Sequence, residues 1–461
     1  MIKTDLLIAE IGSTTTVVSA FNQIDTDPVL LGQGQYRTTV SEGDVNLGLQ
    51  GAIRDLAQQL GEDVSWERFM ASSSAAGGLR MTVHGLVYDM TVKAAREAAL
   101  GAGANLKFVT AGKLRATDLA KIKEIDPNII LIAGGVDYGE RETALYNAEL
   151  IRSLGLASPI IYAGNIENQE EIRLIFKDSG VKLYLVENVY PKIDELNIEP
   201  TRKVIQLAFE EHITTAPGME KIRELVDGHI IPTPGAVMEA AMLLQADIGP
   251  LVCVDIGGAT TDIHSCTTDS LEYSRILLDP EPEHKRTVEG DLGMFINRRS
   301  VLDLIEDKEL IRTLGLDRAE AEALCQDLAP IPESPEQFAL VTLLAQTALK
   351  IALKRHAGSI KEYFSPSGRK TMAQGKDLTA VRYFIGTGGA LTRLPEHTAI
   401  IKAALAQPRK LELLPDKAIE IYIDEQYIMA SLGVMSLQYK EAARKLLRSS
   451  LRLSLGEDKN E

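Results

Sequence analysis

Two short segments of this sequence place an acidic residue, a glycine and hydroxyl side chains in the same order. Glu10 begins the run Glu-Ile-Gly-Ser-Thr-Thr-Thr, and Asp255 begins the run Asp-Ile-Gly-Gly-Ala-Thr-Thr. Glycine lets the backbone approach a phosphate closely, and N–H and hydroxyl groups in such a turn can donate to phosphate oxygens. A carboxylate at the end of the preceding strand can hold Mg²⁺ or its water ligands. Each segment therefore predicts a phosphate-binding hairpin.

The two segments are copies of one motif, because a shift of 245 residues, which moves Glu10 onto Asp255, aligns them without a gap. An internal repeat of this kind indicates two related lobes. One such turn alone is more often structural, but two copies in register favour a nucleotide. The residues predicted to bind its phosphates are Gly12, Ser13, Thr14, Thr15, Gly257, Gly258, Thr260 and Thr261. The carboxylates predicted to hold Mg²⁺ are Glu10 and Asp255.

The second copy adds Asp262 where the first has Val17. A carboxylate beside a phosphate site costs affinity unless a cation neutralises it, so Asp262 suggests a metal ion or a water molecule to orient. The alternative is a solvated hairpin residue. We predict that Asp255, Asp262 and Glu10 form the catalytic set.

A third glycine-rich turn, Gly386-Thr387-Gly388-Gly389, follows the apolar run Val381–Ile385. Its glycines leave room for a flat adenosine group against the backbone. A single turn of this type is a weak signal, but here it is the third member of an ordered set. Gly386, Gly388 and Gly389 are therefore predicted to bind adenosine, and one ATP–Mg²⁺ is expected to bridge the two hairpins.

The elements that position these turns can be read from the apolar pattern. Leu6–Ala9 and Val17–Ala20 are expected to be the strands of the first hairpin, with a helix over 47–60. From about residue 80 to 212, short apolar runs alternate with helical stretches, which predicts a parallel sheet covered on both faces. The expected strands are 107–110, 129–132, 160–163 and 182–186, and the expected helices include 116–125 and 139–154.

The predicted domain boundaries follow from this pattern. They are a first ATPase lobe at 1–79, an inserted α/β domain at 80–228, a connecting helix at 229–250, a second lobe at 251–287, a helical subdomain at 288–380 and the rest of the second lobe at 381–461. A loop through Pro234 is expected to lead into a helix at 236–245. Gly134-Gly135 is either a ligand turn at a strand end or a tight turn, and His84 is expected to be a surface or capping residue.

Bulk composition limits the function classes. The 461 residues carry a net charge of −16, so nucleic acid and anionic membranes are poor partners. The N-terminus lacks the pattern of a secretory signal, and no apolar run is long enough to cross a bilayer. Three cysteines without paired spacing favour neither disulfides nor zinc. We expect a cytoplasmic protein and leave a homo-oligomer open.

The ordered motifs resemble the signature of the actin/hexokinase/Hsp70 ATPase superfamily. Its two phosphate motifs match the hairpins, its adenosine motif matches Ile385–Ala390, and its two connecting helices resemble Pro234–Ala236 and Ala430–Gly433. Gly290 lies in a segment, 289–293, that resembles the stretch after the second hairpin in Hsp70-like members. The resemblance implies two ribonuclease H-like lobes, here with an inserted doubly wound α/β domain and a helical subdomain, and it implies ATP and Mg²⁺ as cofactors.

Within this superfamily the chain resembles the glutamate mutase accessory family called GlmL or MutL, which is unrelated to the mismatch-repair protein of the latter name. The stretches that carry the resemblance are Ser72–Met81, Met90–Ala99 and Leu131–Asp137. It implies an ATPase that acts as a chaperone or reactivating factor for an adenosylcobalamin-dependent mutase, such as glutamate mutase or an aminomutase.

Two positions depart from the superfamily pattern. The first acidic residue is Glu10 rather than Asp, and Thr233 stands where related ATPases have an acidic residue that aligns water. Slow ATP turnover, with the nucleotide as a conformational switch, is therefore expected.

Two other function classes compete with this one. A small-molecule kinase of the same superfamily would need a general base, for which Asp44, Asp89 and Asp137 are candidates, although each is expected to be a loop or capping residue. A dehydratase activator would need clustered cysteines for an iron–sulfur cluster, and Cys253, Cys266 and Cys325 are scattered. The absence of an Asp-x-His-x-x-Gly loop argues against a base-off cobalamin domain.

Overall fold

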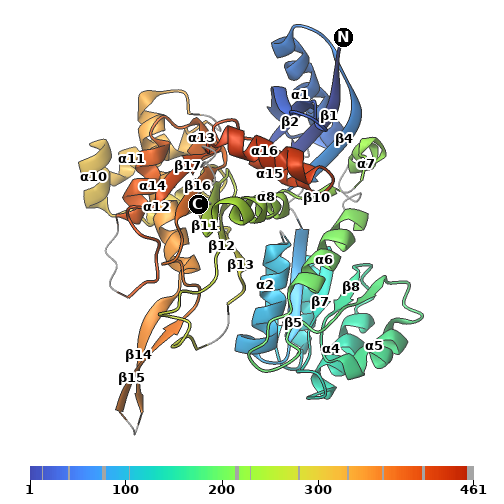
Figure 1. The fold of residues 1–461 in the computed structure, drawn as a ribbon. Helices are drawn as coiled ribbons and strands as arrows, with labels where there is room; N and C mark the ends of the chain where they lie inside the picture. The colour runs from blue at the N-terminus through green and yellow to red at the C-terminus, as the bar shows by residue number, and fades with distance from the viewer. Residues whose placement is uncertain are drawn as a thin grey trace, which may run out of the picture. The chain divides into compact units, whose positions relative to one another are not determined.

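The structure, a computed structural model, describes residues 1–12, 14–39, 42–74, 79–102, 104–212, 218–228, 230–278, 281–329, 332–365, 368–406 and 411–453. The chain forms two compact units, which are described separately (Figure 1). Unit 1 contains residues 1–24 and 30–236, and unit 2 contains residues 25–29 and 237–461.

Unit 1 contains a five-stranded sheet in the order β10-β4-β1-β2-β3. Its strands are β1 (Ile2–Ile11), β2 (Thr15–Asn22), β3 (Val29–Arg37), β4 (Val64–Ser73) and β10 (Ile230–Pro232), and its first helix is α1 (Val45–Leu60). β1 pairs antiparallel with β2 and parallel with β4, which in turn is parallel to β10. The run from Leu6 to Ala9 is fully buried, as expected for a strand that is covered on both faces.

Unit 2 contains a second sheet of the same topology, in the order β13-β12-β11-β16-β17. Its strands are β11 (Leu251–Ile256), β12 (Thr261–Cys266), β13 (His284–Glu289), β16 (Tyr383–Thr387) and β17 (Glu420–Ile423). β11 pairs antiparallel with β12 and parallel with β16, as β1 does with β2 and β4. The two sheets are ribonuclease H-like, which confirms the predicted fold class.

An entirely parallel sheet is inserted into unit 1 between β4 and β10, in the order β6-β5-β7-β8-β9. Its strands are β5 (Leu79–Gly85), β6 (Ala104–Ala111), β7 (Ile129–Ile132), β8 (Ile160–Tyr162) and β9 (Leu183–Leu185). The helices of this region are α2 (Lys93–Gly101), α3 (Ala116–Ile125), α4 (Glu142–Ser153), α5 (Gln169–Phe176), α6 (Glu199–His212) and α7 (Met219–Leu225). The doubly wound domain is thus confirmed, although β5 was not among the predicted strands.

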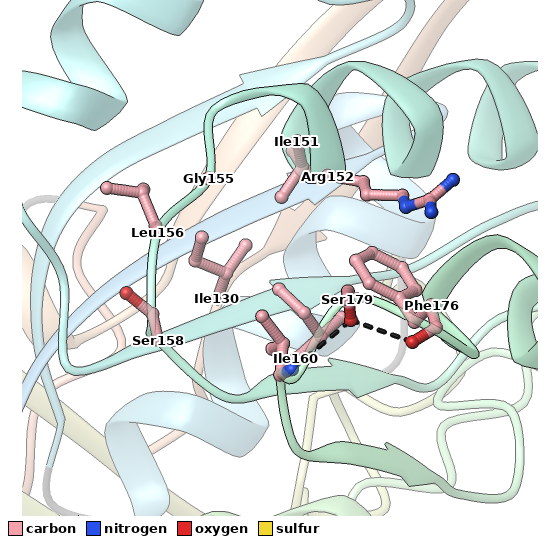
Figure 2. Close-up of a pocket in the computed structure, with 10 residues that line it drawn as sticks. Ile130, Ile151, Arg152, Gly155, Leu156, Ser158, Ile160, Phe176 and Ser179 are labelled. Atoms are coloured by element: carbon pink, nitrogen blue, oxygen red, sulfur yellow. Dashed lines mark hydrogen bonds between the residues drawn. The ribbon is translucent and has the colours of Figure 1, made fainter.

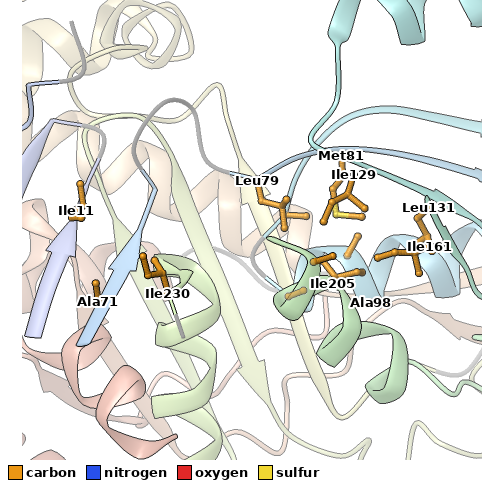
Figure 3. Packing of buried hydrophobic residues seen from close by; sticks show 14 of the residues in the cluster. Ile11, Ala71, Leu79, Met81, Ala98, Ile129, Leu131, Ile161, Ile205 and Ile230 are labelled. Carbon is orange, nitrogen blue, oxygen red and sulfur yellow. The ribbon is translucent and has the colours of Figure 1, made fainter. Parts of the chain in front are cut away.

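One hydrophobic cluster of unit 1 spans the first lobe and one face of the inserted sheet. It joins Ile11 and Ile230 in the first sheet to Leu79, Leu131 and Ile205 in the inserted domain (Figure 3). All five side chains are fully buried. The first lobe and one face of the inserted sheet therefore share a core, while Ile130, Ile160 and Tyr162 on the other face belong to a second cluster.

Of the remaining helices, the first precedes the second hairpin and the others follow it. They are α8 (Thr233–Ile248), which leads the chain from unit 1 into unit 2, then α9 (Arg298–Asp303), α10 (Asp307–Leu314), α11 (Arg318–Gln326), α12 (Pro335–His356), α13 (Gly389–Arg393), α14 (His397–Leu405), α15 (Met429–Ser436) and α16 (Lys440–Ser450). A separate hairpin, β14 (Ser359–Ser365) with β15 (Gly368–Gln374), interrupts the region predicted to be helical.

Among the described helices, α12 is long and apolar enough to span a membrane by length and composition alone. Its buried residues, among them Leu344, Ala348 and Leu353, belong to the hydrophobic core of unit 2. α12 therefore has the burial of a core helix.

Two local predictions were wrong. His84 is fully buried in β5, where its two ring nitrogens contact Thr110 Oγ1 at 2.8 Å and Thr82 Oγ1 at 3.0 Å. These hydroxyls satisfy the imidazole inside the sheet, so it is neither a surface nor a capping residue. α8 begins at Thr233 rather than Ala236, because proline is compatible with the first turn of a helix.

Candidate nucleotide-binding site

The two predicted hairpins close with the same backbone geometry. Gly12 N–H donates to the Thr15 carbonyl at 3.0 Å, and Gly257 N–H donates to the Thr260 carbonyl at 2.9 Å. The strand register is also the same, since Glu10 lies opposite Val17 and Asp255 lies opposite Asp262. The sequence repeat is therefore a repeat of structure.

The first hairpin is held from the side by Thr38. Its backbone N–H donates to the Thr14 carbonyl at 2.9 Å, and its hydroxyl donates to the Gly12 carbonyl at 2.8 Å. Thr14 and Thr15 are exposed, and Glu10 is 7% exposed at the end of β1. Ser13 lies outside the described residues. The turn thus offers hydroxyls to solvent while its carbonyls are bonded to the protein.

The second hairpin is held by the segment that follows β13. Met294 N–H donates to the Gly257 carbonyl at 3.1 Å, and Phe295 N–H donates to the Gly258 carbonyl at 2.9 Å. Asn297 Nδ2 links the hairpin turn to the segment after β13, donating to the Ala259 carbonyl at 2.9 Å and to the Gly290 carbonyl at 2.8 Å. Gly290, predicted to bind nucleotide by resemblance, is exposed and lies beside the turn.

One predicted phosphate donor is engaged elsewhere. The Thr261 hydroxyl is fully buried and donates to the Leu292 carbonyl at 2.7 Å. Thr16, at the equivalent position of the first hairpin, is also fully buried and bonds the Thr38 hydroxyl at 3.0 Å. In both hairpins the buried threonine therefore fastens the turn to its support, and Thr14, Thr15 and Thr260 remain as the candidate hydroxyl donors.

Asp262 is not a solvated hairpin residue. It is 3% exposed, and Arg286 of β13 donates to its Oδ2 at 3.1 Å. Burial raises the pKa of Asp262, and Arg286 opposes that rise. The second oxygen, Oδ1, is buried without a hydrogen-bond partner in the described structure. Sequence reasoning considered a metal ion or water for Asp262 and missed this arginine, which comes from a strand more than 20 residues downstream.

The Asp262–Arg286 pair gives a first testable prediction. Removing one member of a buried ion pair leaves an uncompensated charge and costs about 3–5 kcal/mol. We expect Asp262→Asn and Arg286→Met each to lower the free energy of unfolding by roughly this amount, whereas the double variant lowers it by less than their sum. Urea unfolding of the four proteins measures the coupling. Strictly additive losses would show that the pair does not interact.

Asp255 lies at the end of β11, between the second hairpin and the adenosine turn. Burial, and then the neighbouring Asp262, raise the pKa of Asp255 to about 7. Its Oδ1 lies over Gly388, and a Cβ added to that glycine would sit only 2.3 Å from this oxygen. A partly buried carboxylate that resists ionisation, next to the unpartnered Asp262 Oδ1, is an environment that a bound cation would stabilise. These residues therefore fit a Mg²⁺ site.

The third glycine turn divides into positions with different roles. Gly386 is a packing residue of β16, because a Cβ there would meet Ile423 Cδ1 at 2.8 Å. Gly388 has φ +85°, while Gly389 is exposed and a Cβ there would meet nothing within 4 Å. Only Gly389 is therefore open enough for a flat ring, and Gly386 and Gly388 shape the turn.

Asp424 fixes the adenosine turn, and sequence reasoning missed it. It is 1% exposed, accepts from the Thr387 hydroxyl at 2.9 Å, and accepts from the backbone N–H of Ile428 at 3.1 Å and of Met429 at 2.9 Å. The carboxylate thereby ties β16 to the start of α15. The acidic residue just before the small-residue helix 430–433 was the available signal.

In the inserted domain, the described glycine turn after β7 leaves no room for a nucleotide. At Gly134 and Gly135, where a ligand turn or a tight turn had been left open, a Cβ would meet Asn165 N at 3.3 Å and the Glu140 carbonyl oxygen at 2.7 Å. The loop therefore folds back over its own glycines. A cavity of about 120 Å³ lies between β7, β8 and the ends of α4 and α5 (Figure 2). It is too small for a ligand of drug size. It is lined by Ile130, Ile151, Arg152, Gly155, Leu156, Ser158, Ile160, Phe176, Ser179 and Val181.

Metal-binding clusters do not occur among the described residues, where no group of three or more His, Cys, Asp or Glu side chains could hold an ion. Cys253, Cys266 and Cys325 are buried free thiols. Burial raises the pKa of Cys253 well above its ordinary value, so this thiol is unreactive. A bound Mg²⁺ would therefore need ligands in addition to the Asp255 and Asp262 carboxylates. Phosphate oxygens usually supply such ligands.

Comparison with known proteins decides the family. A family model described as MutL protein matches residues 6–451. Protein MutL of Clostridium tetanomorphum is 35% identical over 458 residues, which is 96% of this chain and 98% of that protein. The chain belongs to the MutL family. The resemblance found in the sequence is thereby confirmed for nearly the whole chain.

Solved structures resemble this MutL-family chain only weakly. A nucleotide-free acetone carboxylase is 13% identical, with 94% of this chain and 70% of that chain covered and a TM-score of 0.41. A glycerol dehydratase reactivase is 12% identical, with 94% of this chain and 99% of that chain covered and a TM-score of 0.35. At these scores neither adds to the description of the fold given above.

Thr233 stands at the start of α8 in this MutL-family chain, where an acidic residue is the superfamily pattern. It is 6% exposed, and its hydroxyl donates to Ser72 Oγ at 3.3 Å. A neutral hydroxyl that is bonded to another hydroxyl cannot serve as a strong general base.

Proposed function

We propose that this chain is an ATP-binding, slowly hydrolysing accessory protein that acts as a chaperone or reactivating factor for an adenosylcobalamin-dependent mutase. The choice of client is supported by membership of the MutL family. The sequence resembles the glutamate mutase accessory proteins of that name. The nucleotide assignment rests on the two hairpins.

The observation that carries the proposal is the repeated turn. Two sheets of the same topology each present a hairpin closed by one backbone bond, Gly12 to Thr15 and Gly257 to Thr260. Each has a carboxylate, Glu10 or Asp255, at the end of the strand that leads into it. A structural turn has no need for a partly buried carboxylate whose pKa is raised to about 7, since withdrawing that charge from water costs stability. A bound cation and phosphate would explain it.

In each hairpin the carboxylate at the end of the leading strand, Glu10 or Asp255, would hold Mg²⁺, directly or through water ligands. When bound, the ion neutralises phosphate charge and polarises the bond to the transferred phosphoryl group. Thr14, Thr15 and Thr260 would donate to phosphate oxygens. Asp262 would orient a water molecule through its unpartnered Oδ1 while Arg286 holds the other oxygen. Gly389 would leave space for the adenosine group.

ATP would act by shifting a conformational equilibrium of the chain. A shift from mostly one state to mostly the other takes ~5 kcal/mol of differential binding. Several charge-assisted hydrogen bonds from the hairpins to the terminal phosphate can supply energy of this order. Hydrolysis then removes those contacts, so slow turnover suits a switch.

The proposal is tested in two steps that separate nucleotide from client. Calorimetric titration with ATP and Mg²⁺ is expected to give one site per chain, and adding the protein, ATP–Mg²⁺ and fresh cofactor to an inactivated adenosylcobalamin mutase is expected to restore activity. Binding without any recovery of glutamate mutase or an aminomutase would keep the nucleotide site but reject the client.

A small-molecule kinase is the competing function, because a kinase would also bind ATP in the first step. Two of its three candidate bases have structural roles. Asp44 caps α1 and pairs with Lys221 at 2.8 Å, and Asp137 accepts from the Ile166 N–H and from Asn188 Nδ2, each at 2.9 Å. The third, Asp89, is exposed. Turnover that rises steeply with one phosphoryl acceptor would nevertheless favour the kinase over the accessory protein.

A further inference from the structure

The β14–β15 hairpin of unit 2 is an arm without a core of its own. The two strands form a separate two-stranded sheet, and the described hydrophobic core of unit 2 contains no residue from 359–374. Figure 1 shows the hairpin extending away from the helices of the same unit. A two-stranded hairpin is at best marginally stable by itself in water, so its base must hold it in place.

The base of the arm is fastened tightly. Gly358 N–H donates to the Lys376 carbonyl at 2.6 Å, and a Cβ on Gly358 would lie 2.6 Å from the Gly375 carbonyl carbon. Only glycine allows the two chain segments to touch there. Lys376 is fully buried and donates to the carbonyls of Thr267 and Pro282, each at 2.6 Å.

The outer edges of both strands are also paired near the base. Leu278 N–H donates to the Ala373 carbonyl at 2.9 Å, and Ile360 N–H donates to the Leu411 carbonyl at 2.8 Å. Beyond these positions no described residue pairs with either outer edge. The arm is therefore rigid where it leaves unit 2 and open along its free end.

The strand register gives the free end one basic face. Lys361 lies opposite Met372 and Tyr363 lies opposite Lys370, so Lys361 and Lys370 share a face. On the other face Glu362 forms an ion pair with Arg369, which leaves that face neutral. Both lysines are exposed. Although the whole chain carries a net charge of −16, this basic face of the arm attracts an acidic partner.

We propose that this arm is the element through which the chain docks an acidic surface of its client protein, with the Lys361–Lys370 face toward that client. An alternative role for lysines on an open strand edge is to prevent aggregation. That role would not require the arm to be fastened at its base by buried Lys376 and by the close contact of Gly358 with Gly375. The identity of the client rests on the proposed function, whereas the docking face does not.

Three variants test the arm. The first deletes residues 361–372 and joins Ile360 to Ala373 through Asn-Gly, a sequence suited to a tight hairpin turn, which preserves the Ile360–Ala373 pair and the base. The second reverses the basic face with Lys361→Glu and Lys370→Glu. The control, Lys308→Glu with Arg312→Glu, makes the same charge change at exposed positions on α10.

Binding to purified glutamate mutase holoenzyme is measured with ATP–Mg²⁺ at about 50 mM and about 150 mM NaCl, across which surface charge is increasingly screened. We expect the first two variants to bind at least about tenfold more weakly, with a smaller salt dependence, while the control and the ATP turnover of all three match the wild type. Unchanged mutase binding by the shortened arm would overturn the inference.

Two further outcomes also overturn it. Wild-type binding to a DNA duplex that charge reversal abolishes would assign the basic face to nucleic acid. If the wild type does not bind the mutase, the client of the proposed function is rejected, and with it the partner named here. Loss of ATP binding would leave the inference about the arm unchanged.

Discussion

Replacing Asp255 by asparagine is expected to stabilise the nucleotide-free chain while removing its ATP turnover. Burial raises the pKa of Asp255 to about 7 in the folded state. This folded pKa lies above the pKa of an aspartate in the unfolded chain, which is about 4. Protonated Asp255 therefore contributes its full stability below pH ~4, and this contribution is lost as the pH rises to about 7. At ~1.4 kcal/mol per pKa unit the penalty above neutral pH is on the order of 4 kcal/mol.

Asparagine keeps the shape of the side chain without the buried charge, so the variant escapes this penalty. In the presence of a chelator, we expect the melting temperature of Asp255→Asn to exceed that of the wild type, by a larger margin at pH 8 than at pH 5. ATP turnover should fall at least about 100-fold, because the cation loses a ligand. Asp89→Asn, at an exposed position, is the control and should change neither quantity.

The site assignment would be wrong if Asp255→Asn kept wild-type ATP affinity and turnover. A lower melting temperature at pH 8 would show instead that the ionised carboxylate is satisfied by the protein alone. The two readouts therefore test the chemistry and the electrostatics of one residue independently.

A second large effect is expected at Gly388, where the adenosine turn touches the second hairpin. Its φ is +85°, and an added Cβ would lie 2.3 Å from Asp255 Oδ1 and 2.6 Å from Ile256 N. A backbone atom cannot yield as a flexible side chain can, and the left-handed conformation costs a further ~1 kcal/mol or more. Gly388→Ala should therefore lower the free energy of unfolding by about 3 kcal/mol or more and abolish stabilisation by ATP.

Gly389→Ala is the matched control, one residue along in the same turn. A Cβ there meets nothing within 4 Å, and the position starts α13, where alanine is favoured over glycine. Urea unfolding with and without ATP should show unchanged or slightly raised stability. If the adenosine group lies over this residue, ATP affinity alone falls. Equal destabilisation by both substitutions would mean that the turn tolerates no side chain anywhere and that Asp255 is not the reason.

The sequence predicted best what depends on neighbours along the chain. The apolar runs at 129–132 and 160–163 became β7 and β8 with errors of at most one residue, because buried parallel strands need continuous apolar side chains. The hairpins were also predictable, since their acidic residue, glycine and threonines lie within seven positions and recur in the second lobe.

What could not be predicted depends on contacts between distant strands. His84 looked like a surface residue because Thr110, its partner across β6, lies 26 positions away. The neutralising group of Asp262 was sought in a metal ion because nothing in the motif points to Arg286 on β13. The β14–β15 arm was missed for a different reason: its strands carry charged residues and have no apolar alternation, since they cover no core.

The core that unit 1 shares with its inserted domain has a mechanical consequence. Side chains from Ile11 in β1 to Leu131 in β7 belong to one packed cluster, and close-packed interiors deform little under small displacements. A shift imposed on the Glu10 hairpin is therefore passed to the inserted sheet as rotation of a stiff body rather than absorbed at a hinge. The inserted domain would then turn as a lever fixed to the first lobe, and its far end would move further than the Glu10 hairpin.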